Sequence, residues 1–190
     1  MRKQSIHHMA CRRAQAGTSL IEVSIALAIL LIASVGIMGL CAISMVTTEN
    51  QGHLMARASE YSQDKMEQLI SLAYTDPVSN TATFPTTPSG GTGLTVGGSS
   101  NPAAPATGYV DYLDFNGNPL PIGVSAPATW YYIRVWAISN PAGAPVYGAI
   151  TTLKQITVTT KVRNGVAGPR AGGGLAPRAT MSSLMTYQKP

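Results

Sequence analysis

The most metal-like pattern in this sequence is a short stretch rich in aspartate and asparagine. The side-chain oxygens of Asp114, Asn116 and Asn118 alternate along the chain as they do in a calcium-binding loop. Such a loop also needs glycine at its sixth position and glutamate at its twelfth, but here Gly117 is fourth and Ser125 is twelfth. An Asn-Gly pair between two strand-like runs favours a β-hairpin turn. The three residues are therefore only a weak calcium candidate.

No other set of residues predicts catalysis or cofactor binding. The histidines, His7, His8 and His53, are too scattered to form a metal site. The sequence offers no Ser-His-Asp or Cys-His arrangement and no phosphate-binding loop. The cysteines, Cys11 and Cys41, lie in a basic segment and an apolar segment, so we expect no disulfide between them. We expect a protein that is not an enzyme and holds no cofactor.

Glu22 is the carboxylate with the most unusual surroundings. It stands at the start of residues 23–48, a run of 26 positions without a charged residue or a proline. A helix needs about 20 apolar residues to cross a bilayer, so this run is long enough. A charge at the edge of a spanning segment is costly unless it is paired, which makes Glu22 a functional candidate.

The basic residues are unevenly distributed along the chain. The formal net charge is +5, but four of the 13 Lys and Arg residues precede position 18. The remaining nine face eight acidic residues, so the rest of the chain is nearly neutral. A basic segment before an apolar helix predicts a cytoplasmic N-terminus and an exported C-terminal part. The same distribution argues against binding to nucleic acid.

The junction at residues 17–23, GTSLIEV, resembles the prepilin signature of type IV pilins and type II secretion pseudopilins. The resemblance implies a leader peptide at 1–17, cleavage by a prepilin peptidase after Gly17, and N-methylation of Thr18. Thr18 stands where the family most often has phenylalanine. The resemblance further implies that Glu22 is an assembly residue, whose carboxylate pairs with the new α-amino group of a neighbouring subunit. Such a pair would fix the axial offset between helices.

The helix predicted at 18–48 would then be a transmembrane segment that becomes the filament core. Gly36 and Gly39 are three residues apart within it and could allow close helix packing or local flexibility. Residues 49–75 continue as an amphipathic helix, which places one helix from about Thr18 to Tyr74. Its expected core face is Met55, Ala58, Met66, Leu69, Ile70 and Ala73, with Glu60, Asp64, Lys65 and Glu67 lying elsewhere around the helix.

Beyond this helix the sequence predicts a loop and then a β-rich head. In residues 76–108, 22 of 33 positions are Gly, Pro, Ser or Thr, so we expect a long loop that could still pack locally on a sheet. Residues 109–190 read as strands at 109–115, 129–138 and 153–163, in an antiparallel meander. A last strand at 179–186 could form the edge. The fold class expected is α+β, with a pilin-like long helix packed on a small antiparallel sheet.

Residues 58–72, with KMEQL at 65–69, resemble the segment after the membrane helix in V-type minor pilins and in minor pseudopilin I. The resemblance implies a structural minor pilin that initiates or caps a type IV pilus. It also implies residence in a bacterial inner membrane, with the head in the periplasm, before export to the cell surface. Its partners would be the prepilin peptidase, other major and minor pilins, and an inner-membrane assembly platform driven by a motor ATPase.

Two alternatives share this scaffold, and a third is of another kind. The nearest is a minor pseudopilin of type II secretion. A tip adhesin or DNA-uptake subunit would use a basic and aromatic surface drawn from Arg134, Lys161, Arg163, Arg170, Arg178, Trp130 and Trp136. We favour solvated strand faces and core aromatics for these residues. A membrane-anchored enzyme would need a catalytic set that the sequence does not offer.

Overall fold

The structure is a computed structural model that describes residues 19–83, 87–88, 90–122, 126–148, 150–163 and 176–187. The chain divides into two compact units, Met1–Val46 and Thr47–Pro190. The class is α+β: one long helix precedes a set of antiparallel strands.

The helix, α1, spans Leu20–Ile70 without interruption. It forms because this stretch has no proline and its three glycines each cost only about 1 kcal/mol relative to alanine. It ends four residues before the predicted Tyr74. Its last turn closes with hydrogen bonds from the Ser71 backbone to the Glu67 carbonyl (3.0 Å) and from the Ser71 hydroxyl to the Gln68 carbonyl (2.8 Å).

The strands belong to one main sheet and two small hairpins. The main sheet has the order β10-β9-β6-β4-β5, every neighbouring pair is antiparallel, and β3 also pairs with β6. Hairpins β1–β2 and β7–β8 stand apart from it. The bounds are β1 (Ser79–Asn80), β2 (Thr87–Pro88), β3 (Gly97–Gly98), β4 (Val110–Leu113), β5 (Pro119–Leu120), β6 (Tyr132–Ser139), β7 (Val146–Tyr147), β8 (Ile150–Thr151), β9 (Leu153–Val162) and β10 (Arg178–Thr186).

The predicted meander is confirmed for β6, β9 and β10, and the predicted edge strand is β10. The hairpin formed by β4 and β5 departs from the predicted meander. Here β5 lies outside β4, and the chain then returns to place β6 on the other side of β4. The Asn-Gly turn falls between β4 and β5 as expected.

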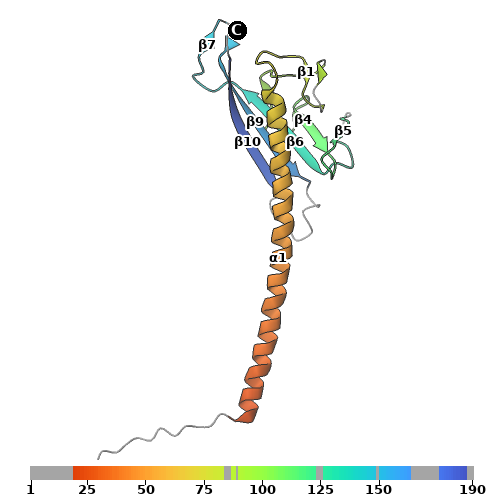
Figure 1. The fold of residues 1–190 in the computed structure, drawn as a ribbon, viewed down its shortest axis with the longest axis vertical. Helices are drawn as coiled ribbons and strands as arrows, with labels where there is room; N and C mark the ends of the chain where they lie inside the picture. The colour runs from red at the N-terminus through yellow and green to blue at the C-terminus, as the bar shows by residue number, and fades with distance from the viewer. Residues whose placement is uncertain are drawn as a thin grey trace, which may run out of the picture. The chain divides into compact units, whose positions relative to one another are not determined.

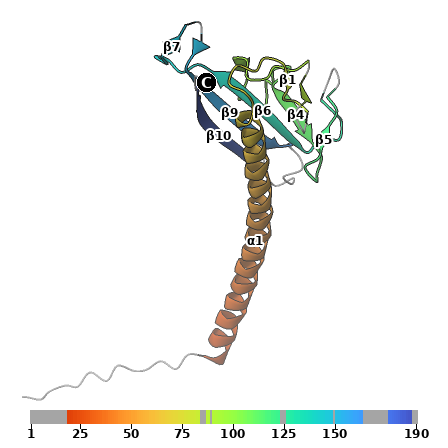
Figure 2. The same cartoon turned by 45° about the horizontal axis from the view of Figure 1, so that its top comes forward.

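Within the second unit, the C-terminal half of α1 lies over one face of the main sheet (Figures 1 and 2). Alternate residues of β6 face opposite sides of the sheet. Tyr132, Trp136 and Ile138 join the helix-side clusters, whereas Ile133 and Val135 form a cluster on the other face. The helix contributes Leu54, Tyr61, Met66 and Leu69, and β9 contributes Ile156, Val158 and Val162.

The predicted core face of α1 was partly wrong. Met55 and Ile70 are 44% and 43% exposed, because they lie at the edge of the buried stripe rather than in it. Lys65, which we expected away from the core face of the helix, is fully buried. Hydrophobic periodicity could not place it, because a charged side chain reaches a core position only when its partners lie there too.

The Gly- and Pro-rich segment 76–108 is more than a connection. Leu94 is fully buried in the cluster formed by α1, β6 and β9, and the Thr81 side chain is also inaccessible. Gly97 pairs with Ile138 of β6, and Gly98 pairs with Ala137. The local packing on the sheet that the sequence allowed is therefore present.

Candidate functional site: an exposed apolar helix and a buried charge cluster

The first unit presents an apolar helix surface on every side. Each described side chain from Leu20 to Val46 is exposed, including Leu31 at 67% and Met38 at 72%. A helix that is apolar all round is stable only when lipid or other helices surround it. It is also the one helix, among the described residues, that is long and apolar enough to cross a membrane.

Three serines in this helix satisfy their hydroxyl groups internally. Ser24, Ser34 and Ser44 each donate to the carbonyl four residues earlier, at 3.0, 2.7 and 2.9 Å. A hydroxyl bonded this way needs no water, which lowers the cost of placing it among apolar groups. The serines recur at ten-residue intervals, but this spacing did not by itself indicate the bonds.

Glu22 lies in the first turn of α1 and is exposed. The backbone of Ser19 accepts bonds from the amides of Glu22 (2.9 Å) and Val23 (3.2 Å), which closes that turn. A carboxylate at this position is stabilised by about 0.3–1 kcal/mol through the helix dipole. Glu22 can therefore serve its own helix as well as a partner. Gly17 and Thr18, the predicted cleavage site, lie outside the described residues.

Gly36 and Gly39 both lie within uninterrupted helix. A Cβ atom added at either position would meet nothing within 4 Å. The two glycines therefore leave shallow places on an exposed surface that a neighbouring helix could approach closely. Their predicted role in packing or flexibility stays a prediction.

The second unit contains a cluster of buried charges that the sequence did not reveal. Asp111 on β4 receives two parallel hydrogen bonds from Arg134 on β6: Nε to Oδ1 at 2.9 Å and Nη2 to Oδ2 at 3.0 Å. Lys65 on α1 lies 2.7 Å from the same carboxylate. All three side chains are at most 2% exposed. One anion therefore joins the helix to two strands.

Each cation in this cluster has further partners. The Lys65 ammonium also donates to the Gln68 side chain (2.7 Å) and to the Thr81 carbonyl, and it lies 4.5 Å from the centre of the Trp136 ring. Arg134 donates its Nη1 to the Tyr61 carbonyl at 3.2 Å. It also lies 3.6 Å from the half-exposed Asp64. These contacts supply the hydrogen bonds that a buried charge requires.

The surroundings shift the titration of this cluster. Burial by itself would raise the pKa of Asp111, but Lys65 and Arg134 together hold that pKa below its usual range. Burial lowers the pKa of Lys65 and outweighs Asp111, which raises it. An ionised Asp111 that accepts three charge-assisted bonds is a clamp between elements. It is poorly suited to be a general base, because two cations hold it ionised and their donors occupy three of its about four lone-pair sites.

The calcium candidate is organised as a turn. Asp114 Oδ1 accepts the amides of Asn116 and Asn118 at 2.8 Å each, and Oδ2 accepts the Asn118 side-chain amide at 3.0 Å. These bonds direct N–H groups, not oxygens, at the carboxylate. Gly117 has φ of 89°, and a Cβ there would lie 2.4 Å from the Tyr61 hydroxyl oxygen. The hairpin interpretation therefore explains all four residues.

Two of the residues considered for a basic and aromatic DNA-binding surface lie in the core. Arg134 is 2% exposed and Trp136 fully buried, so neither can contact a strand of nucleic acid. Our expectation that Arg134 is solvated was also wrong, because Asp111 draws it into the core. Arg163 stacks on Trp130 at 5.2 Å and donates to the carbonyls of Ala128 and Trp130. Arg170 lies outside the described residues.

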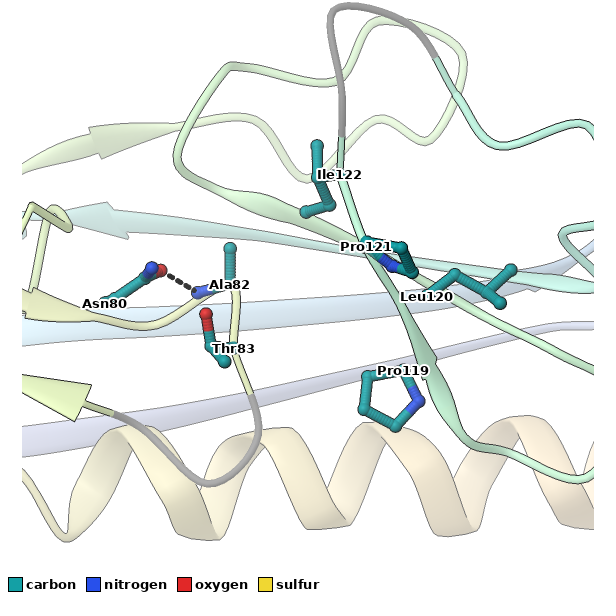
Figure 3. A pocket seen from close by; sticks show the side chains of 7 residues that line it. All are labelled: Asn80, Ala82, Thr83, Pro119, Leu120, Pro121 and Ile122. Carbon is teal, nitrogen blue, oxygen red and sulfur yellow. Dashed lines mark hydrogen bonds between the residues drawn. The ribbon is translucent and has the colours of Figure 1, made fainter.

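A shallow hollow of about 410 Å³ lies between the β1 turn and β5 (Figure 3). Its lining carries no ionisable side chain, so it offers no acid or base; the residues are Asn80, Ala82, Thr83, Pro119, Leu120, Pro121 and Ile122. Within the described parts of the chain, no group of three or more His, Cys, Asp or Glu residues could hold a metal ion.

Comparisons of the chain with protein-family models, with curated proteins and with solved structures give no match.

Proposed function

We propose that this chain is a pilin-like structural subunit. It is made as a precursor, held in the bacterial inner membrane by residues 18–48, and assembled with other subunits into a filament of the type IV pilus class. The observation that carries the proposal is the fully exposed apolar helix from Leu20 to Val46, with Glu22 in its first turn and Gly17 just before it. Among filament classes, the 33-residue low-complexity segment 76–108 favours a V-type minor pilin over a type II secretion pseudopilin, because minor pseudopilins of the I type are usually smaller.

The mechanism follows from the position of one carboxylate. Cleavage after Gly17 would create an ammonium group at Thr18, four residues before Glu22. In a bundle of staggered helices, the Glu22 carboxylate of one subunit can neutralise the Thr18 ammonium of the next. Both charges would then avoid the cost of being unpaired in an apolar medium. The pair sets the offset between helices, and the exposed apolar surface supplies the contact area.

Mass spectrometry of the intact mature protein tests the first step. We expect a chain that starts at Thr18 and carries one methyl group. The matched variant is Gly17→Ile, which a peptidase requiring a small residue before the cut should leave unprocessed. A mature protein that retains Met1 in cells with an active prepilin peptidase would remove the main support.

Substitution of Glu22 tests the second step. We expect Glu22→Val to be processed and inserted normally but to enter filaments poorly, because the Thr18 ammonium loses its partner. Glu22→Gln keeps the size of the side chain but removes its charge, so it separates the effect of the lost charge from that of altered packing. If Glu22 served only its own helix dipole, both variants would assemble like the wild type.

A further inference from the structure

We draw no further inference here: the strongest candidate, the shallow hollow of about 280 Å³ lined by Tyr74 after α1, by β8 and by Lys154 on β9, carries nothing, because the Lys154 ammonium already donates to the carbonyls of Tyr74 and Leu94 and nothing in the structure shows what covers the hollow.

Discussion

Asp111→Asn is the substitution that most directly tests the buried charge cluster. It keeps the shape of the side chain but removes the one anion that Lys65 and Arg134 share. The new amide retains a single oxygen acceptor and directs an N–H₂ group toward a cationic donor. Two positive charges would then face each other in a region from which water is excluded.

The loss of stability expected for Asp111→Asn follows from the contacts of the Asp111 carboxylate. Three charge-assisted hydrogen bonds at about 1.5–3 kcal/mol each would give an upper bound of about 5–9 kcal/mol. Removal of one partner from a buried ion pair costs about 3–5 kcal/mol, because neighbours relax and some water enters. We therefore expect Asp111→Asn to lower the free energy of unfolding by about 3–5 kcal/mol. For a unit of this size it corresponds to a fall in Tm of roughly 10–20 °C.

The assay is unfolding of the full-length protein in detergent, followed by near-ultraviolet circular dichroism, since Trp136 touches the cluster. Asp64→Asn is the matched control. It is the same chemical change near the same Arg134, but at 3.6 Å and on a side chain 55% exposed. Solvent screening limits its cost to below about 1 kcal/mol.

The pH dependence gives a second readout of the same variant. The pKa of Asp111 is lower in the folded state than in the unfolded state, so its contribution is fully present above about pH 4. That contribution is lost as the pH falls through the folded pKa. The difference between wild type and Asp111→Asn should therefore shrink in acid. An Asp111→Asn variant as stable as Asp64→Asn at pH 7 would refute the clamp.

Two further substitutions test the packing around the cluster. Gly117→Ala should lower the free energy of unfolding by about 2–4 kcal/mol, because it places a side chain at a left-handed φ and against Tyr61. Gly143→Ala, at φ 77° with open space around it, measures the cost of the left-handed φ alone, about 1 kcal/mol. Equal costs for the two variants would contradict the close approach of Gly117 to Tyr61. Leu94→Ala should lower the free energy of unfolding by about 2–5 kcal/mol, because its side chain is fully buried. Val96→Ala is the control: its side chain is 49% exposed, so the change should be less than about 1 kcal/mol. A small effect of Leu94→Ala would show that segment 76–108 is not part of the core.

The sequence predicted the helix and the strands better than it predicted which side chains are buried between them. The long helix, the strands at β4, β6, β9 and β10, and the Asn-Gly turn all follow from local patterns, namely apolar periodicity and turn residues. The alternation of Ile133 and Val135 against Trp136 and Ile138 also follows from the sequence, because period-2 alternation in a strand is independent of what covers each face.

The charge cluster could not be predicted because it depends on long-range pairing. Lys65, Asp111 and Arg134 are 46 and 23 residues apart in sequence, and each by itself favours a solvated position. The sequence allowed segment 76–108 to pack on the sheet but did not single out Leu94, because its neighbours are Gly and Thr and no periodicity marks it. The cleavage site at Gly17 and Thr18 stays a prediction, since it lies outside the described residues.

The clamp also restricts how this protein can change over evolutionary time. Loss of Asp111 alone leaves Lys65 and Arg134 as buried cations without their shared anion, whereas loss of one cation leaves Asp111 paired with the other. Either cation can therefore be lost before the anion at a smaller cost than the anion before the cations. Divergent descendants of this chain that lack Asp111 should therefore lack Lys65 and Arg134 as well.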